Sequence, residues 1–208
     1  KTVGNQGMGN VGSNAAKIFC HRGAKVVAVS DVSGGIYHAD GLDMDAISAY
    51  LETPMSFLKD YNADGITHIT NEDVLTTKCD VLVPAALENQ ITKDLAPKLN
   101  CTYIVEAANG PTTQEADEIL KERKITLIPD IFANSGGVIV SYVEWVQNIQ
   151  ELTWDREQVN DMLEKLMTKS FQEILKEVNE HHCTFRMGAY IVALKKLIYA
   201  EEIKGILT

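Results

Sequence analysis

The sequence lacks several features that would assign it at once to a class of protein. Only four of its 208 residues are cysteine, and none stands in a C-x-x-C pair or at zinc-ligand spacing, which favours free thiols in a reducing compartment. No apolar run approaches the roughly 18 residues of a membrane span and no segment has the pattern of a signal peptide, so we expect a cytoplasmic protein without membrane contact. Clustered basic residues are also absent, and the net charge of −10 argues against nucleic acid as a partner.

The start of the chain is also unusual. It begins with Lys1 instead of methionine, and the first recognisable motif follows within a few residues. We therefore expect the sequence to be one part of a longer protein. Its composition, with 45% hydrophobic and 23% charged residues, is that of an ordinary globular protein and excludes disordered and fibrous classes.

Short apolar runs alternate with helical patterns over the first 130 residues. The runs are rich in Val, Ile and Leu without strict polar alternation, as in strands covered by helices on both faces. The expected strands are Thr2–Asn5, Lys25–Ser30, Ile66–Ile69, Asp80–Pro84, Thr102–Glu106 and Ile125–Ile128. The expected helices between them are Val11–Arg22, Asp43–Glu52, Asn71–Thr77, Thr92–Leu99 and Thr113–Arg123. This alternation predicts an α/β fold with a doubly wound, Rossmann-like, mostly parallel sheet.

The sequence from Gly136 onward is helical in pattern. Apolar residues recur every three to four positions between Val159 and Val178, which places them on one stripe of a long helix. The same spacing fits a heptad coiled coil, but a stripe that covers one side of a sheet is the favoured interpretation. A last helix is expected over Phe185–Ile203.

A G-x-G-x-x-G motif follows the first expected strand and opens the first expected helix. It consists of Gly7, Met8, Gly9, Asn10, Val11 and Gly12. In such motifs the first glycine allows a tight turn, the second lets the backbone approach a pyrophosphate, and the third lets the helix pack closely on the strand. The helix N-terminus then offers free N–H groups to the phosphates. The motif predicts a Rossmann dinucleotide-binding domain in residues 1–150, followed by C-terminal helices in residues 151–208.

Asp31 ends the second expected strand, 19 residues after Gly12. An acidic side chain at this point can accept hydrogen bonds from the hydroxyls of the adenosine ribose. Val32 follows, and neither Arg nor Lys stands in the next few positions to neutralise a 2′-phosphate. We therefore expect NAD rather than NADP as the cofactor. The alternative is a glycine turn that only packs a strand on a helix, with an Asp that only caps a loop.

Three later stretches stand where strands are expected to end, at residues 84–89, 106–111 and 129–137. Ligands of open α/β sheets bind along this edge. Small residues such as Ala85 and Ala86 would let a flat cofactor lie close, while Asn109 and Asn134 offer amide groups. Taken singly, each stretch is equally consistent with an ordinary turn rich in Asn, Gly and Pro.

Together the three stretches resemble the C-terminal, coenzyme-binding half of glutamate dehydrogenase, in the Glu/Leu/Phe/Val dehydrogenase family. The quoted segments are Val-Pro-Ala-Ala-Leu-Glu-Asn-Gln-Ile at 83–91, Glu-Ala-Ala-Asn-Gly-Pro-Thr-Thr at 106–113 and Pro-Asp-Ile-Phe-Ala-Asn-Ser-Gly-Gly at 129–137, continuing to 148. The strand that ends in Asp31 and part of the last helix also match. The chain departs from the family at Gly4 and Asn5, which are usually apolar, and at Met8, usually Phe. We therefore expect the first strand to pack less well than usual.

The resemblance implies a role for each matching residue. Gly7, Gly9, Asn10 and Gly12 would hold the pyrophosphate and Asp31 the adenosine ribose. Ala86 and Asn109 would contact the ribose on the nicotinamide side, and Asn134 would lie near the nicotinamide. The expected cofactor-binding set is completed by Met8, Val11, Val32 and Ala85. Ser141 would hydrogen-bond the side-chain carboxylate of glutamate, although a serine in an apolar helix can also bond its own i−4 carbonyl.

The implied activity is the reversible oxidative deamination of L-glutamate to 2-oxoglutarate and ammonia, with hydride transfer to NAD. In the family, the lysine and carboxylate that assist proton transfer belong to the N-terminal half. We therefore expect no catalytic residue and no turnover in this chain alone. Lys195 and Lys196 are expected to be solvated surface groups. None of the five histidines, the adjacent His181 and His182 included, is expected to bind a metal.

Two alternatives stay open. One is a dehydrogenase for a branched-chain or aromatic amino acid, which would need no donor at Ser141. The other is a dinucleotide-binding module without catalytic activity. The family implies a homohexamer assembled largely through the absent half, so we expect this chain alone to be a monomer or weak dimer. Its last helix, from about Phe185, is expected to pack on the absent N-terminal domain.

Overall fold

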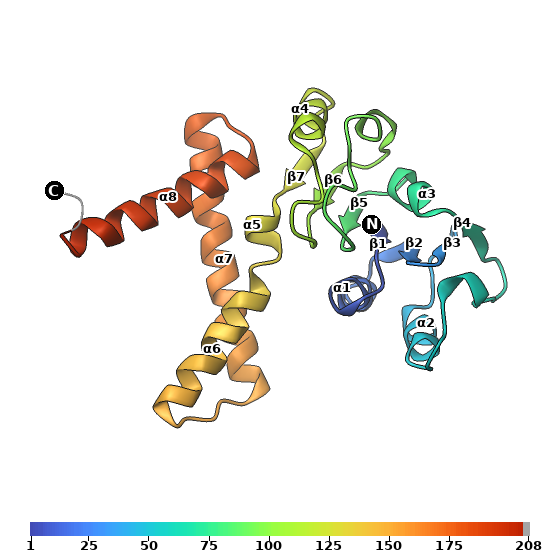
Figure 1. Cartoon of the computed structure of the whole chain (residues 1–208), viewed down its shortest axis with the longest axis horizontal. Coiled ribbons are helices and arrows are strands. Elements are labelled where there is room, and N and C mark those ends of the chain that lie inside the picture. Colours follow the sequence, from blue (N-terminus) through green and yellow to red (C-terminus); the bar gives the residue numbers. More distant parts are fainter. Residues whose placement is uncertain (206–208) are drawn as a thin grey trace. The chain divides into compact units, whose positions relative to one another are not determined.

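The structure, a computed structural model, describes residues 1–205 (Figure 1). Contacts between residues divide the chain into two compact units, residues 1–127 and the residues from 128 onward. The domain boundary that the sequence predicts lies further along, after residue 150, and stays a prediction. None of the helices in the described part of the chain combines the length and the apolar character that a membrane crossing requires.

The first unit is built around one twisted sheet. Its strands are β1 (Thr2–Gln6), β2 (Lys25–Asp31), β3 (Gly34–Tyr37), β4 (Thr67–Ile69), β5 (Val81–Pro84), β6 (Tyr103–Val105) and β7 (Thr126–Ile128). They lie in the order β4-β3-β2-β1-β5-β6-β7. β1 is parallel to β2 and β5, and β5 is parallel to β6, whereas β3 is antiparallel to both of its neighbours. The predicted Rossmann-like, mostly parallel α/β fold is therefore confirmed.

β3 is a strand that the sequence prediction missed. Two glycines follow Ser33 and read as a turn, but the chain folds back as an antiparallel hairpin in which Asp31 pairs with Gly34. Gly35 is required at its position, because a Cβ atom there would lie 2.6 Å from Val74 Cγ2. Glycine inside a strand is typical of such a close approach by a neighbouring element.

The α-helix predicted over Thr92–Leu99 is wrong. Its residues form only a short 3-10 turn at Ala96–Lys98. Pro97 would stand in the interior of the predicted helix, where it lacks the N–H group that a helix needs and clashes with the preceding turn. The backbone before it is held by a neighbouring segment instead, since Ile91 N donates to Pro111 O at 2.8 Å.

β1 packs more tightly than its composition suggests. Residues 3–6 are all buried, and the strand is paired along both edges. The expectation of a poorly packed first strand is therefore wrong. Gly4 leaves no large gap, because a Cβ atom at this position would be at ordinary contact distance, 3.4 Å, from Cys79 Sγ. The register against β2 shifts by one residue between Val3 and Gly4.

Helices cover both faces of the sheet. α1 (Asn10–His21) and α2 (Met44–Leu51) share one buried core with the sheet, and α3 (Asn71–Thr76) and α4 (Gln114–Glu122) share the other. Successive strand residues serve opposite cores, as Leu82 and Val83 do on β5. Complete burial of such a side chain contributes roughly 1.5–3 kcal/mol. This two-sided burial explains why the strands read as continuous apolar runs.

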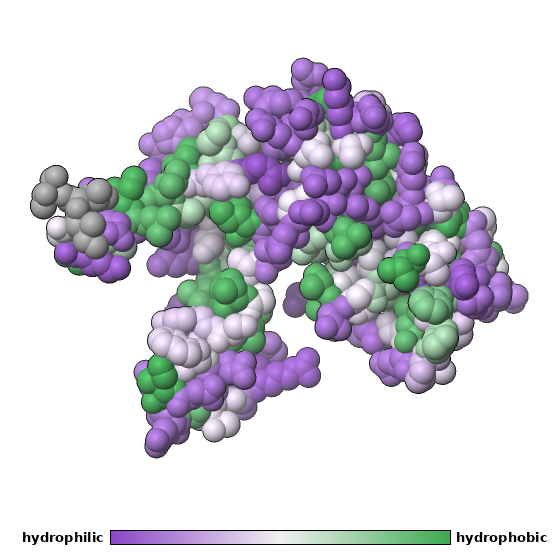
Figure 2. Space-filling model, in the orientation of Figure 1, coloured by the Kyte–Doolittle hydropathy of each residue, from purple (hydrophilic) through white to green (hydrophobic). Residues whose placement is uncertain are grey.

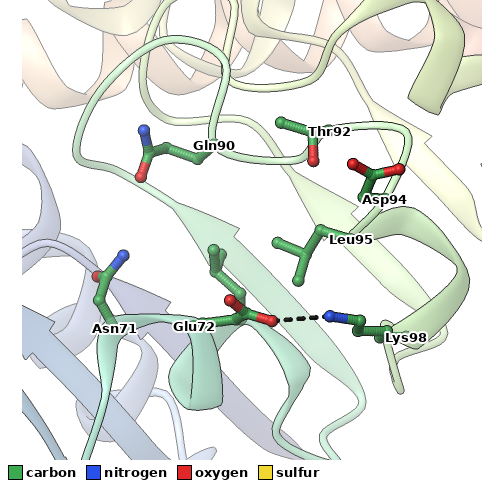
Figure 3. Close-up of a pocket in the computed structure, with 8 residues that line it drawn as sticks. Asn71, Glu72, Gln90, Thr92, Asp94, Leu95 and Lys98 are labelled. Atoms are coloured by element: carbon green, nitrogen blue, oxygen red, sulfur yellow. Dashed lines mark hydrogen bonds and ion pairs between the residues drawn. The ribbon is translucent and has the colours of Figure 1, made fainter.

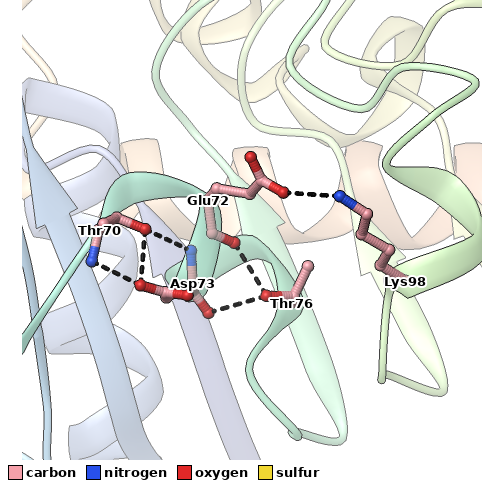
Figure 4. A network of polar contacts seen from close by, with 5 residues as sticks. All are labelled: Thr70, Glu72, Asp73, Thr76 and Lys98. Atoms are coloured by element: carbon pink, nitrogen blue, oxygen red, sulfur yellow. Dashed lines mark hydrogen bonds and ion pairs between the residues drawn. The ribbon is translucent and has the colours of Figure 1, made fainter.

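A capping box fixes the start of α3 (Figure 4). Thr70 donates to Asp73 Oδ2 from its backbone N at 2.9 Å and from its hydroxyl at 2.6 Å, and Asp73 N donates back to Thr70 Oγ1. The hydrogen bonds from Thr70 lower the pKa of Asp73 below its usual value. Beside them, Glu72 forms an ion pair with Lys98 at 3.0 Å, which joins α3 to the 3-10 turn.

The second unit is helical, as the sequence pattern predicts. It contains α5 (Asp130–Ala133), α6 (Gly136–Gln150), α7 (Arg156–His181) and α8 (Phe185–Ile203). α7 packs against both α6 and α8. α8 approaches α7 closely at Gly188, where a Cβ atom would lie 2.7 Å from Val178 Cγ2. α7 therefore packs between α6 and α8, and the expectation that its apolar stripe covers one side of a sheet stays a prediction.

Ion pairs join α7 to α8, and they involve the two lysines that were expected to be solvated. Lys195 Nζ donates to both carboxylate oxygens of Glu177, at 2.7 and 2.8 Å. Lys196 pairs with Glu173 at 2.6 Å. The hydrogen bond from Lys195 lowers the pKa of Glu177, a residue that is only 7% exposed. The two lysine side chains are 58% and 60% exposed, as expected of solvated surface groups, and each ammonium also pairs with an acid of the facing helix.

Candidate functional site

The carboxyl ends of four parallel strands meet at one edge of the sheet. The turn after β1 begins at Gly7, whose N–H donates to Ser30 O of β2 at 2.9 Å. The segment after β5 is attached to β1, since Ala85 N donates to Gln6 O at 2.8 Å. Strand order reverses between β1 and β5, because β2 lies on one side of β1 and β5 on the other. Such a switch point is where ligands of open α/β sheets bind.

The glycine turn is shaped by three different constraints. Gly7 has a φ of +98°, and a Cβ atom there would lie 2.9 Å from Ala85 O. Gly12 touches the same turn from the first helix, since a Cβ atom on it would lie 1.9 Å from Gly7 O. Gly9 differs, because a Cβ atom on it would meet nothing within 4 Å. Packing therefore requires glycine at positions 7 and 12, while at position 9 the protein itself leaves the space open.

The N-terminus of α1 opens directly from this turn. Its capping residue is Gly9, no side chain caps its first N–H groups, and its first turn contains no acidic residue. These N–H groups carry the positive end of the helix dipole, so they attract anions. Of the other motif residues, Met8 is half-buried, whereas Asn10 and Val11 are exposed. The turn fits a pyrophosphate, as the sequence motif predicts.

Asp31 lies at the end of β2 and is held rigidly. Its Oδ1 accepts hydrogen bonds from Ser33 N at 2.7 Å and Ser33 Oγ at 2.5 Å. Its Oδ2 accepts one from Leu58 N at 2.8 Å. A carboxylate can accept about four hydrogen bonds, so these three leave capacity for a ribose hydroxyl. Val32, the next residue, is 95% exposed and contacts little of its own chain.

Lys59 is a residue near this acid that the sequence pattern missed. Its backbone N donates to Ser33 Oγ at 3.1 Å, and its ammonium lies 5.9 Å from the centroid of the Phe57 ring. Neither Arg nor Lys stands in the next few positions after Asp31 in the sequence, and the fold brings only the backbone of Lys59 against the turn that follows Asp31. No local signal reveals the contact, because it joins the turn between β2 and β3 to a residue 26 positions further along the chain.

The other predicted cofactor residues of the first unit lie along the same edge. Ala85 and Ala86 directly follow β5, and Ala86 is exposed. Asn109 follows β6 in a segment that is attached to β5, since Ala108 N donates to Pro84 O at 2.9 Å. The structure thus gathers the glycine turn, Asp31, Ala85, Ala86 and Asn109 at one edge of one sheet.

Asn134 and Ser141 belong to the second unit. Asn134 ends α5, and Ser141 lies in the second turn of α6 with its surface exposed. Within the described residues, the Ser141 hydroxyl has no hydrogen-bond partner, so the alternative bond to its own i−4 carbonyl is not made. A short helix, α5, is fixed to α8 by the ion pair between Asp130 and Arg186 at 3.4 Å.

A cavity of about 230 Å³ lies between α3 and the β5–β6 connection (Figure 3). Asn71, Glu72, Gln90, Thr92 and Lys98 are among the residues that line it. None of the residues predicted to bind the dinucleotide belongs to its lining. It is linked to the glycine turn through Gln6, whose amide donates to Gln90 Oε1 at 2.7 Å.

The cysteines and one cluster of acidic and histidine side chains are the other groups with possible chemistry, and burial and ion pairing explain them. All four cysteines are free, and burial raises the pKa of Cys79 to about 11 and that of Cys101 to about 12. Both are therefore protonated, unreactive thiols at neutral pH. Ligand atoms of Glu177, Glu180 and His181 lie within 4.8 Å of one another. Lys195 already donates to both oxygens of Glu177, so we assign this cluster no metal.

Comparison with known proteins places the fold and the motifs in one family. Residues 1–205 match the sequence model of a family described as Glutamate/Leucine/Phenylalanine/Valine dehydrogenase. Glutamate dehydrogenase A2 of Halobacterium salinarum is 46% identical over 202 residues, which are 97% of this chain and 48% of that protein. The cryptic catabolic NAD-specific glutamate dehydrogenase GudB of Bacillus subtilis is 45% identical over 96% of this chain and 46% of its own length.

A solved structure extends this likeness to three dimensions. The hetero-hexameric glutamate dehydrogenase from Thermus thermophilus, in its Leu-bound form, superimposes with a TM-score of 0.89 and 31% identity. The match covers 100% of this chain and 48% of that chain, so the chain spans about half the length of its relatives. The match to the family extends through the glycine turn, the Asp31 strand and the helices of the second unit. The chain therefore belongs to the Glutamate/Leucine/Phenylalanine/Valine dehydrogenase family.

Proposed function

We propose that this chain is the coenzyme-binding half of an NAD-dependent glutamate dehydrogenase. The enzyme would interconvert L-glutamate with 2-oxoglutarate and ammonia. The observation that carries the proposal is the glycine turn at the strand switch point. Gly7 and Gly12 are required because the fold leaves no room for a side chain there, whereas Gly9 borders open space. A turn with open space at this glycine would let a pyrophosphate approach the backbone.

The described residues would bind and orient the dinucleotide. The uncapped N–H groups of α1 would hold the pyrophosphate, and Asp31 would accept hydrogen bonds from the adenosine ribose. Ala85, Ala86 and Asn109 would line the nicotinamide side. When bound, the nicotinamide accepts a hydride from the substrate. Proton transfer would depend on groups outside this chain, so the chain alone would bind coenzyme without turnover.

Gly9→Ala tests the pyrophosphate site. The new methyl group meets no protein atom within 4 Å, so the melting temperature of the chain should fall by no more than the small cost of alanine at a helix N-cap. It would occupy the path of the pyrophosphate, so the Kd for NADH, measured by titration calorimetry, should rise at least about tenfold. Asn14→Ala, on the exposed side of α1, is the matched control and should leave Kd as in the parent. Undiminished NADH binding by Gly9→Ala would contradict the proposed site.

The proposal of NAD rather than NADP rests on Asp31. A fixed carboxylate repels a 2′-phosphate but accepts hydrogen bonds from a 2′-hydroxyl. The NAD-specific description of the relative from Bacillus subtilis supports the same choice. The coenzyme preference would therefore depend on the Asp31 carboxylate.

Titration of the chain with NADH and NADPH tests the coenzyme preference. We expect a Kd for NADH about tenfold or more below that for NADPH, because Asp31 disfavours the phosphate. Asp31→Asn retains the size of the side chain and removes its charge, so the difference between the two Kd values should shrink. Asp64→Asn, at an exposed position elsewhere, should leave both unchanged. Equal affinity of the parent for the two coenzymes would overturn the choice of NAD.

Substrate choice would depend on Ser141. Its hydroxyl is exposed on α6 and has no hydrogen-bond partner among the described residues, so it is available as a donor. A donor here suits the side-chain carboxylate of glutamate. An apolar substrate, such as a branched-chain or aromatic amino acid, would leave this donor unpaired on desolvation.

Ser141→Ala, made in the longer protein that contains the remaining half, tests the substrate. Loss of a hydrogen bond to a charged group should raise KM for L-glutamate about tenfold or more, with little change in melting temperature. Gln150→Ala, at the exposed end of the same helix, is the control. An unchanged KM of Ser141→Ala would refute glutamate recognition by Ser141. Turnover of leucine or phenylalanine in place of glutamate by the parent protein would identify the alternative substrate. No turnover of any amino acid by the parent would favour a binding module without catalysis.

We propose that the last helix docks on that remaining half. Only Gly188 and Ala189 of α8 are buried, whereas seven of its large apolar side chains are exposed: Met187, Tyr190, Leu194, Leu197, Ile198, Tyr199 and Ile203. Figure 2 shows green, hydrophobic surface along part of α8. So much apolar area on one helix is typical of an interface. The relatives are about twice as long as this chain, so their additional half is the occupant we choose.

Leu197→Glu in the longer protein tests the docking. Leu197 is 63% exposed in this chain, so the change should not alter the melting temperature of the chain alone. In the longer protein it should lower specific activity about tenfold, because a charge would be buried at the contact. Met55→Glu, which adds a charge at another exposed apolar position, is the control. Light scattering of the parent should give six copies, and normal activity and assembly of Leu197→Glu would refute the docking.

A further inference from the structure

Asn5 is a buried amide in the middle of the sheet. It lies on β1 with no measurable exposure, between Val29 of β2 and Val83 of β5. Its side chain points to the α1 face, because a Cβ atom on Gly12 would lie 3.2 Å from Asn5 Nδ2. Burial by itself gives no reason for a polar side chain at this position.

The amide holds the glycine turn. Asn5 Nδ2 donates to Gly7 O at 2.9 Å, in a buried position. The N–H of Gly7 is also held, since it donates to Ser30 O at 2.9 Å. Gly7 thus has its N–H fixed to β2 and its carbonyl fixed to β1, in a left-handed conformation with a φ of +98°.

The direction of the Gly7 carbonyl also determines where the next N–H points. A trans peptide is planar, so its carbonyl and the following N–H point in opposite directions. The chain has no cis peptide bond among its described residues. With Gly7 O directed inward at Asn5, the Met8 N–H is directed away from the sheet, at the turn that precedes the uncapped N-terminus of α1.

The oxygen of the Asn5 amide, in contrast, destabilises the folded chain. Among the described residues, Asn5 Oδ1 is buried without a hydrogen-bond partner. A buried acceptor without a donor costs free energy. An apolar side chain would avoid that cost, although it would deprive Gly7 O of the donor that Asn5 supplies. These two effects on stability oppose each other, so stability alone gives little reason for an amide at this position.

We propose that Asn5 is a positioning residue for dinucleotide binding, acting through Gly7 to aim the backbone N–H groups of the turn at the pyrophosphate. The inference rests on the proposed coenzyme-binding function. The Asn5 side chain would thereby determine the direction of the backbone N–H groups of the turn. The amide contacts the peptide and not the ligand, so its loss would weaken binding of ligands that carry a pyrophosphate.

Asn5→Val in this chain separates positioning from support of the fold. The melting temperature should stay within about 2 °C of the parent, because the lost hydrogen bond and the removed unpaired oxygen offset each other. The Kd values for NADH and for ADP, which both carry a pyrophosphate, should rise about tenfold. The Kd for adenosine, which carries none, should not change. A purely structural role would weaken all three ligands together and lower the melting temperature.

Two further variants complete the test. Asn5→Asp retains the size of the side chain but offers no donor when ionised, so it should lose NADH affinity at least as strongly. Ser48→Ala is the matched control: Ser48 Oγ, on α2, is another buried oxygen without a partner among the described residues. Its removal should raise the melting temperature and leave every Kd unchanged.

The outcomes distinguish this inference from the function on which it rests. If the parent chain binds NADH and Asn5→Val binds it equally well, the positioning role is refuted and the coenzyme site stands. If the parent binds no dinucleotide, the proposed function fails and the inference fails with it. If Asn5→Val and Asn5→Asp both fail to fold, Asn5 supports the structure as a whole and the positioning role is refuted.

Discussion

The contact between Gly12 and the carbonyl of Gly7 is the constraint on which the first unit depends. A single methyl group at position 12 would place a carbon 1.9 Å from that oxygen, so α1 can begin here only without a side chain at this point. The contact fixes the distance of α1 from β1 and brings the helix N-terminus to the carboxyl edge of the sheet. The strand order then places β5 and its following segment beside the same turn. Without this approach, the parts of the site would not meet.

The polar groups beneath the site serve the fold and the ligand at the same time. Asp31 ends a strand, closes the β2–β3 hairpin through Ser33 and anchors Leu58, and still offers acceptor capacity to a ribose. Asn5 likewise combines a hydrogen bond that shapes the turn with an oxygen that has no partner among the described residues. Groups fixed in this way are preorganised, so they lose little conformational entropy when a ligand binds. The proposed coenzyme site therefore consists of residues that also hold strands and loops together.

The second unit has a different physical character. Its helices are joined by ion pairs such as Lys195 with Glu177 and by the close approach of α8 at Gly188, while many large apolar side chains stay exposed. A sheet domain buries its own hydrophobic faces, but these helices leave theirs open. This contrast suits a unit whose apolar surface is completed by further protein.

The sequence by itself determined the alternation of strands and helices, the glycine turn and the acid after β2, because each is encoded by neighbouring residues and by a local period. It missed the strand at Gly34–Tyr37, where Gly35 is explained only by the close approach of Val74, and it wrongly extended a helix through Pro97. Only the tertiary structure decided the proximity of Lys59 to the Asp31 loop, the pairing of Lys195 and the grip of Asn5 on Gly7. The first two of these contacts join residues far apart in the chain. The third depends on which face of β1 meets α1, so no local pattern contains any of the three.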